Sequence, residues 1–377
     1  MGTFRMLKFY EFFAGGGMAR CGLGNQWSCV FANDFDLKKC RAYERNWGEG
    51  VLVRNDLRNL TTDDIPAGAA VDLAWASFPC QDLSLAGAGA GLRGDRSGTF
   101  WSFWGLVRGL LRDGRPPTVV VLENVCGALT SHGGRDFDTI CSTFVREGYA
   151  CGAMVIDASL FVPQSRPRLF FVGVRADALP AMDVLADPSS IWHSPSLRRA
   201  HSQLRNELKA HWVWWNLPEP AGRQLQFADI IEELPTGVRW NTQEETLRLL
   251  SMMSPVNAEK VRLAKSAGRP MVGTVYKRTR RDSDGNKVQR AEVRFDDIAG
   301  CLRTPAGGSS RQVILTVEGD RVRSRLISPR ETARLMGLPE DYELPTNYNE
   351  AYHLTGDGVV VPVVRHLAHN LLEPILK

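Results

Sequence analysis

Asp72-Leu73-Ala74-Trp75-Ala76-Ser77-Phe78-Pro79-Cys80-Gln81 is the stretch that decides the fold of this 377-residue chain. The apolar run from Val71 to Ala76 predicts a buried strand of a parallel sheet. Pro79 ends that strand and fixes the backbone just before Cys80. Reacting groups in open α/β sheets lie beyond the carboxyl ends of strands, so Cys80 is a candidate nucleophile. Taken alone, a free cysteine is more often a small buried hydrophobic residue.

Two further segments place polar residues at the ends of apolar strands. Val119 to Leu122 predicts a second buried strand, and Glu123 and Asn124 stand at its carboxyl end. A thiol and a carboxyl at the ends of two strands of one sheet suit covalent catalysis with a positioned acid. In the segment Gln164-Ser165-Arg166-Pro167-Arg168, two arginines precede a third apolar strand and bring positive charge to its start.

The ordered set Pro79-Cys80-Gln81, Glu123-Asn124-Val125 and Gln164 to Arg168 resembles the motifs of DNA (cytosine-5) methyltransferases of the bacterial restriction–modification type. The resemblance runs from about Leu7 to the C-terminus, and only the middle third lacks a clear counterpart. It implies an α/β fold, in which a doubly wound, Rossmann-like domain that uses S-adenosyl-L-methionine carries a smaller, mixed target-recognition domain. We expect a catalytic and cofactor-binding domain in residues 1–180, a target-recognition domain in 181–325, a hinge or structural helix region in 326–350, and a C-terminal segment returning to the catalytic domain in 351–377.

The resemblance also implies a role for each motif residue. Cys80 would add to carbon 6 of cytosine, and Glu123 would hold the N3 and amino edge, with Asn124 orienting that segment. Arg168, with Arg166 beside it, would bind the O2 side and stabilise developing negative charge. Gln81 and the loop after it would close over the site.

A glycine turn near the N-terminus indicates where a cofactor binds. The apolar strand Leu7 to Phe13 runs into Ala14-Gly15-Gly16-Gly17, and glycines allow the backbone to approach a ligand closely. A second strand ends at Asp34, nineteen residues after Gly15, where a carboxylate can accept both ribose hydroxyls. By resemblance, Phe13 and Phe35 would enclose the adenine ring of S-adenosylmethionine.

Asp56 has two interpretations that the sequence leaves open. It matches the family position that hydrogen-bonds the adenine amino group, and it could equally be a helix N-cap. The departure of Gly356-Asp357-Gly358-Val359 from the family's usual Gly-Asn-Ser-Val puts the hydrogen bonds normally made there in doubt. The expected cofactor residues are Phe13, Gly15, Gly17, Asp34, Phe35, Asp56, Leu57, Pro79, Asp357 and Val359.

Composition limits the class of protein. No run of about 18 apolar residues predicts a membrane span, and no apolar signal segment opens the chain. Eight cysteines are scattered without zinc-type spacing, which favours a reducing cytoplasm and argues against a metal site. We therefore expect a protein of the bacterial cytoplasm or nucleoid.

Positive charge concentrates between Arg262 and Arg311, where twelve Lys or Arg residues face five Asp or Glu, an excess larger than the chain's net charge of +4. Such asymmetry is typical of a nucleic-acid surface. Arg303 and Arg311 could instead hold the glycine turn between them. Five tryptophans of the middle region, Trp192 to Trp240, favour a small separate core over base stacking. The expected DNA contacts are Arg93, Arg96 and Ser97 in the loop after Cys80, then Lys277, Arg278, Arg280, Arg281, Arg303, Ser309, Arg311 and Gln312.

The sequence thus predicts methylation of a flipped cytosine in a specific double-stranded DNA sequence, in a restriction–modification system with a possible cognate restriction endonuclease that forms no stable complex. A transfer-RNA cytosine-5 methyltransferase is one alternative. A catalytically silent DNA-binding protein on the same fold is another, although Cys80, Glu123 and Arg168 are intact.

Overall fold

The chain forms two compact units in a computed structural model, which describes residues 5–68, 71–78, 98–178, 184–282, 284–304 and 311–377. Unit 1 comprises residues 1–157, 167–220 and 359–377, and unit 2 comprises residues 158–166 and 221–358. The boundaries differ from those expected at 180 and 351. The first expected domain extends to 220, and the chain returns to it only at Val359.

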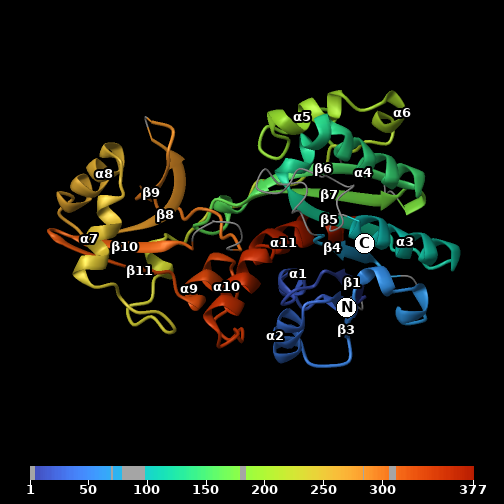
Figure 1. Ribbon diagram of the computed structural model, residues 1–377. Coiled ribbons are helices and arrows are strands. Elements are labelled where there is room, and N and C mark those ends of the chain that lie inside the picture. The colour runs from blue at the N-terminus through green and yellow to red at the C-terminus, as the bar shows by residue number, and fades with distance from the viewer. Residues whose placement is uncertain (1–4, 69–70, 79–97, 179–183, 283, 305–310) are drawn as a thin grey trace. The chain divides into compact units, whose positions relative to one another are not determined.

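Unit 1 is built on a seven-stranded sheet with the order β3-β2-β1-β4-β5-β7-β6 (Figure 1). The pairs among β1 to β5 are parallel, and β7 runs antiparallel to both of its neighbours. This doubly wound α/β arrangement confirms the predicted fold class. The strands are β1 (Leu7–Phe12), β2 (Trp27–Asp34), β3 (Leu52–Arg54), β4 (Leu73–Ala76), β5 (Val119–Val125), β6 (Tyr149–Asp157) and β7 (Pro167–Arg175).

Both faces of this sheet are buried. Tyr10, Phe12 and Leu122 on one face pack with Phe103 and Phe144 from two long helices. On the other face Phe9, Trp75 and Val121 are buried as well. The helices of unit 1 are α1 (Met18–Leu23), α2 (Leu37–Trp47), α3 (Thr99–Arg112), α4 (Arg135–Arg146), α5 (Pro195–Ser202), α6 (Asn206–Lys209), α11 (Val361–Leu367), the π-helical turn η9 (Ala368–Leu372) and α12 (Glu373–Leu376).

The Trp-rich segment after residue 184 belongs to unit 1 up to Pro220, which explains the shifted boundary. The carbonyl of His211 accepts from Cys151 N, so the segment runs along the free edge of β6. Trp215 is fully buried and donates from Nε1 to Val172 O at 3.2 Å. Gly152 admits this segment, since a Cβ there would lie 1.9 Å from Val213 O. Trp192 and Trp215 are buried in unit 1 rather than in a separate core, and Trp212 packs against the core of unit 1. Trp214 is half-buried in unit 1, and Trp240 is half-buried in unit 2.

Unit 2 contains a four-stranded sheet of order β11-β10-β8-β9, in which every pairing is antiparallel. Its small apolar core joins Val275, Val293 and Leu315 of the sheet to Val261 and Ala264 of a helix. The strands are β8 (Met271–Arg281), β9 (Lys287–Arg294), β10 (Val313–Glu318) and β11 (Arg321–Leu326), and the helices are α7 (Gln243–Ser251), α8 (Pro255–Lys265), α9 (Pro329–Leu335) and α10 (Tyr348–Asp357).

A buried ion pair fixes α9 to this sheet. Arg325 and Glu331 have no exposed side-chain surface and are joined by two hydrogen bonds of 2.5 and 2.7 Å. Glu331 also completes a capping box with Ser328, and Pro329 opens the helix, as the sequence predicts. Short 3₁₀ turns complete the two units: η1 (Leu57–Asn59), η2 (Thr62–Asp64), η4 (Cys126–Leu129), η5 (Ser131–Gly134), η6 (Ala158–Leu160), η7 (Ala176–Ala178) and η8 (Ala228–Ile230).

Candidate active site

One row of residues across the sheet of unit 1 marks the edge where the functional groups begin. Phe12 is level with Asn33 on one side and with Ala76 on the other, and Ala76 is level with Leu122. The chain reaches Asp34, Phe13 and Glu123 one residue after this row. The glycine turn after β1 and the Glu123 carboxyl of β5 therefore leave the sheet at the same edge, on either side of β4.

Glu123 and Arg168 form the ion pair of this edge. Arg168 Nε lies 3.1 Å from Glu123 Oε1, and only 16% of the arginine side chain and 9% of the carboxylate side chain are exposed. The antiparallel direction of β7 explains why these two side chains meet. Arg168, the second residue of β7, pairs with Val125 at the end of β5. A carboxyl and a guanidinium thus stand side by side where a heterocyclic base could bond to both.

Asn124 ties the Glu123 segment to the strand that leads to Cys80. Its Nδ2 donates to the carbonyl of Phe78 at 3.3 Å, and its Oδ1 accepts from Val125 N at 2.8 Å. Phe78 stands two residues before Cys80 in the sequence. The predicted residues Pro79, Cys80, Gln81, Arg93, Arg96, Ser97 and Ser309 lie outside the described part of the chain.

Cys126 is a second thiol close to this edge. Burial raises its pKa to about 11, and the nearby charge of Arg168 offsets only part of that effect. A thiol with this pKa stays protonated near neutral pH and is a poor nucleophile. Cys126 is therefore the natural control for Cys80.

The glycine turn after β1 adopts backbone conformations that explain its composition. Phe13, Gly15 and Gly17 all have positive φ, of 57°, 56° and 77°. Among the described residues, apart from the two chain neighbours of Gly15, no atom lies within 4 Å of a Cβ built there, so that side of the turn has room for a ligand. At Gly17 a Cβ would meet Trp47 Nε1 at 2.2 Å, because the indole packs on the turn and donates to Gly16 O at 3.0 Å.

Asp34 lies beside this turn, as the spacing predicts. Its carboxylate accepts from Gly15 N and Asp36 N, both at 2.9 Å. Burial raises the pKa of Asp34, while the charge of Lys39 and the two N–H groups oppose the rise. The carboxylate thus both fixes the turn and presents an acceptor beside it.

Glu11 is a buried carboxyl that sequence reasoning missed. Only 1% of the residue is exposed, and burial raises its pKa to about 8 despite a hydrogen bond from Arg20 N. The signal in the sequence was a charged residue inside an otherwise apolar strand. Trp47 was missed too, and no sequence signal predicts its bond to Gly16.

The remaining predicted cofactor residues differ in their surroundings. Phe35 leaves 67% of its surface exposed, unusual for a phenyl ring directly after a strand of the central sheet. Asp56 is the N-cap of η1, and both of its oxygens bond Arg58, which lowers its pKa. This geometry favours the capping interpretation of Asp56. Leu57 and Val359 are buried in unit 1.

Arg166 occupies a different place from the one expected. Its guanidinium donates to the carbonyl oxygens of Leu302, Gly356 and Gly358 at 2.7–2.9 Å, and to Cys301 Sγ at 3.3 Å. All these partners belong to unit 2, and only 2% of Arg166 is exposed. Its two terminal nitrogens therefore bond groups within unit 2, which corrects the expectation that Arg166 bonds the base.

Asp357 also bonds within unit 2. Its carboxylate accepts from the hydroxyl of Thr304, and a Cβ at Gly356 would approach Thr304 N at 3.4 Å. Asp357 therefore has a partner on the segment that leads to residues 305–310. Gln164 joins the same assembly, since its amide accepts from Leu302 N and donates to Leu335 O.

The predicted DNA contacts of unit 2 separate into exposed and enclosed groups. Gln312 is fully buried and donates to Gly300 O at 2.6 Å, so it cannot reach a base edge, and we remove it from the base contacts. Arg311 bonds Asn349 and stacks over the Tyr348 ring at 5.4 Å, so its guanidinium contacts α10. The exposed predicted residues are Arg278, Arg280, Arg281 and Arg303, with Lys277 half-buried.

Comparisons with known proteins agree with this architecture. The sequence profile described as C-5 cytosine-specific DNA methylase matches residues 7–373. The Type II methyltransferase M.DsaV of Dactylococcopsis salina is 26% identical over 375 residues, which cover 98% of this chain and 87% of that protein. The Type II methyltransferase M.HpaII of Haemophilus parainfluenzae is also 26% identical, over 97% of this chain and 89% of its own.

Solved structures support the fold. The Dnmt2 methyltransferase of S. pombe matches with a TM-score of 0.58 at 16% identity and covers 98% of this chain and 100% of its own. The Entamoeba histolytica methyltransferase EhMeth matches with a TM-score of 0.60 at 14% identity, over 99% of each chain. In the described part of the chain, no helix has the length and apolar character needed to cross a bilayer. The match over nearly its whole length places this chain in the C-5 cytosine-specific DNA methylase family, as an S-adenosylmethionine-dependent DNA (cytosine-5) methyltransferase.

Proposed function

We propose that this enzyme methylates a flipped cytosine within a specific double-stranded sequence through a covalent bond between Cys80 and carbon 6. The observation that carries the proposal is the Glu123–Arg168 pair at 3.1 Å. Its Glu123 lies on β5, next to β4, the strand that precedes Cys80 in the sequence. The names of its relatives support a Type II modification role. In that role the methylation would protect host DNA from a restriction endonuclease that cuts the same site. The setting we propose is the bacterial cytoplasm.

The residues beside the glycine turn fit S-adenosylmethionine. The open space at Gly15 admits a ligand against the backbone, and Asp34 offers a carboxylate to ribose hydroxyls. The exposed ring of Phe35 and the neighbouring Phe13 provide flat apolar surfaces for an adenine. When bound there, the cofactor supplies an electrophilic methyl group.

Carbon 5 of cytosine is too weak a nucleophile to take that methyl group unaided. The thiolate of Cys80 would form a bond to carbon 6, and the electron pair of the 5,6 double bond would become available at carbon 5. Glu123 would hold N3 and the amino group, while the Arg168 guanidinium would bond the O2 side, where negative charge develops. Loss of the carbon 5 proton to a base and departure of the thiolate would restore the ring.

None of these groups can reach a base inside a duplex, so the cytosine must leave the stack, at a cost on the order of a few kcal/mol. Asn124 would keep the Phe78 carbonyl, and with it the start of the Cys80 segment, beside Glu123 during this step. Its role is positioning rather than chemical.

Trapping with 5-fluorocytosine tests the proposal. A duplex carrying this base at the methylated position, incubated with enzyme and S-adenosylmethionine, is expected to give a denaturation-resistant complex, because fluorine cannot leave as a proton does. Cys80→Ser should abolish the complex, and Cys126→Ser should retain it. A complex that persists in Cys80→Ser would overturn the assignment. Bisulfite sequencing of DNA from expressing cells identifies the methylated position beforehand.

A further inference from the structure

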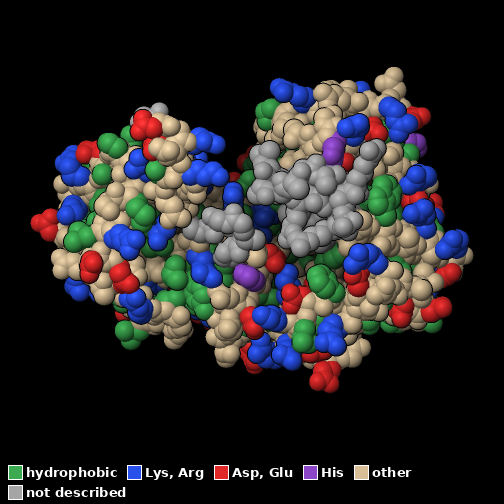
Figure 2. All heavy atoms as spheres, in the orientation of Figure 1, with side chains coloured by type: hydrophobic (Ala, Val, Ile, Leu, Met, Phe, Trp, Pro, Cys, Tyr) green, Lys and Arg blue, Asp and Glu red, His purple; other side chains and the backbone are tan. Residues whose placement is uncertain are grey.

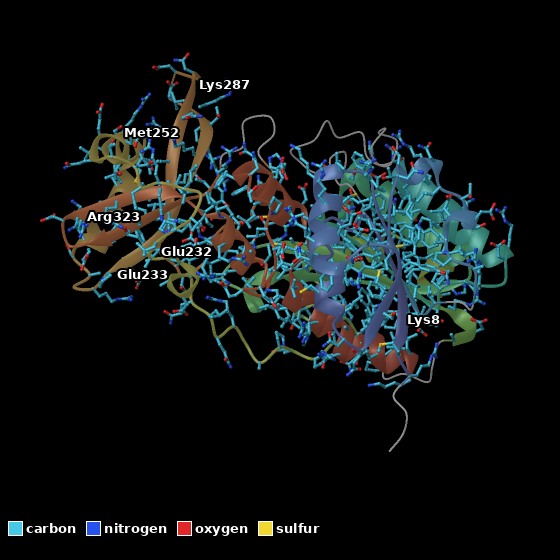
Figure 3. The ribbon with its side chains drawn as sticks, turned by 90° about the horizontal axis from the view of Figure 1, so that it is seen from below. Lys8, Glu232, Glu233, Met252, Lys287 and Arg323 are labelled. Carbon is cyan, nitrogen blue, oxygen red and sulfur yellow. The ribbon has the colours of Figure 1, made fainter. Side chains whose placement is uncertain are left out.

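The hairpin formed by β8 and β9 extends beyond the sheet of unit 2. Residues Met271 to Val275 of β8 pair with β10, whereas Tyr276 to Arg281 pair with β9 alone. These residues and Lys287 to Glu292 form a two-stranded ribbon, closed by a turn in which Asp282 N donates to Asn286 O. Figure 3 shows the ribbon projecting from the sheet, with Lys287 near its end. A ribbon of two strands fits the major groove of DNA.

The register divides the charges of this ribbon between two faces. On one face, Arg278 lies opposite Arg290, with Arg280 and Glu292 at neighbouring positions of the same face. We call this the arginine face; it consists of Tyr276, Arg278, Arg280, Val288, Arg290 and Glu292. The opposite face carries Lys277, Thr279, Arg281, Lys287, Gln289 and Ala291, and it continues the side of the sheet covered by α8.

A single carboxylate holds two arginines of the arginine face. Glu292 Oε1 lies 2.5 Å from Arg280 NH2, and Glu292 Oε2 lies 3.3 Å from Arg278 Nε. Arg278 also stacks over the Tyr276 ring at 5.7 Å. The Tyr276 hydroxyl in turn donates to Cys301 O at 2.8 Å, so the base of this face is fixed to the body of unit 2.

Positive charge on this face exceeds what Glu292 neutralises. Three guanidinium groups stand against one carboxylate, and Arg278 and Arg290 face each other directly, as Arg281 and Lys287 do on the opposite face. Like charges at such paired positions destabilise a strand pair. About half of the Arg278 and Arg280 side chains is exposed, at 48% and 51%. Figure 2 shows Lys and Arg side chains along the surface formed by β8 and β9. A polyanion would relieve the repulsion.

We propose that the arginine face is the phosphate-binding face of the ribbon, and that Glu292 is an internal competitor that phosphate must displace from Arg278 and Arg280. The inference rests on the proposed function for its ligand, duplex DNA. It restricts the expected phosphate contacts of the ribbon to the arginine face, and it adds Arg290 to these contacts. It also assigns a restraining role to Glu292, which keeps the two arginines ordered while DNA is absent and weakens binding to any duplex.

Salt dependence distinguishes the two faces. Binding of a 30-base-pair fluorescent duplex of arbitrary sequence is measured over a series of salt concentrations for Arg278→Ala, Arg280→Ala and Arg290→Ala. Lys277→Ala, Arg281→Ala and Lys287→Ala are the matched controls, since each removes one charge from the opposite face of the same ribbon. We expect the salt slope to fall by about one unit for each variant of the first set and to stay unchanged in the second. Equal slopes in the two sets would overturn the proposal.

Glu292→Gln tests the competitor role through a gain of affinity. We expect roughly twofold to fivefold tighter binding of the same duplex, which is what an exposed ion pair contributes. Asp296→Asn is the control, because it breaks an exposed pair with Arg294 just outside the ribbon. Unchanged or weaker binding by Glu292→Gln would refute the competitor role. Failure of the proposed function would instead appear as absence of the Cys80 adduct in the wild-type enzyme, which these variants do not affect.

Discussion

Glu123 Oε1 and Arg168 Nε lie 3.1 Å apart, although their residues stand 45 positions apart in the sequence and on strands of opposite direction. The antiparallel β7 begins beside the end of β5. Its first charged residue, Arg168, therefore lies at the same edge of the sheet as Glu123. The positive charge of the Arg168 guanidinium stabilises negative charge on the largely buried Glu123 carboxylate. In the function proposed above, this pair would hold a base that gains electron density during the reaction.

Replacing Arg168 by Lys tests this pair. The substitution keeps the charge but removes the planar fork, so one donor to the developing charge is lost and Glu123 loses its fixed partner. We expect single-turnover methylation to slow about 10²- to 10³-fold, the typical effect of removing one such donor. Arg175→Lys, at the other end of β7 beside Asp177, should leave the rate unchanged. A rate within a few fold of wild type for Arg168→Lys would exclude the catalytic role.

Substitution of Arg166, two residues before Arg168, should lower the stability of the fold rather than change the chemistry of methylation directly. A lysine cannot serve the carbonyls of Leu302, Gly356 and Gly358 together, and each buried oxygen left without a donor costs roughly 1–3 kcal/mol. We expect Arg166→Lys to lower the free energy of urea unfolding by at least that amount. Arg330→Lys is the control, since Arg330 also donates to two carbonyls of unit 2 but near the surface. Wild-type stability of Arg166→Lys would contradict the role.

The contrast between Arg168 and Arg166 shows which parts of the site can be predicted from the sequence. Strand ends are predictable because apolar runs stop at polar residues, so Glu123, Asp34 and Arg168 were found at the sheet edge. The partner of Arg166 was not predictable, because Gly356 lies 190 residues away and only tertiary packing brings it near. Gln312 was misjudged for the same reason: an amide suits a base edge, but here it lies inside unit 2.

The expected domain boundary at residue 180 differs from the boundary in the structure for a related reason, which is tertiary packing. Trp192 and Trp215 interrupt the aliphatic pattern of the strands, which suggested a new domain after residue 180. The burial of Trp215 depends on Gly152, whose missing side chain admits residues 213–215. Composition changes at residue 180, whereas the packing continues to residue 220.

Asp34→Ala tests the cofactor assignment. Removing the carboxylate frees Gly15 N and leaves the ribose hydroxyls without their acceptor. We expect S-adenosylmethionine to bind more weakly by roughly 1.5–3 kcal/mol, the range for hydrogen bonds to charged groups. Asp36→Ala is the matched control, because it removes a carboxylate two residues away that caps α2. Calorimetry that finds equal affinity for wild type and Asp34→Ala would exclude Asp34 from the site.

Glu11 gives the fold a pH dependence that can be measured directly. Its pKa rises from 4.5 to about 8 on folding because burial disfavours the charged form. Between these two values the folded protein holds a proton that the unfolded chain has released, so stability falls as pH increases through this window. Glu11→Gln removes the titration. We therefore expect the variant to be more stable than wild type at pH 8.5, by an amount on the order of a few kcal/mol, and the difference to shrink toward pH 5.

Urea unfolding at pH 5, 6, 7 and 8.5 measures that difference as a function of pH. Glu340→Gln serves as the control, since Arg334 lowers the pKa of Glu340 and its carboxylate is ionised in both states throughout this range. The control difference should therefore stay constant with pH while the Glu11 difference grows. Parallel curves for wild type and Glu11→Gln would mean that Glu11 is already ionised in the folded protein, with Arg20 N and its other neighbours compensating for its burial.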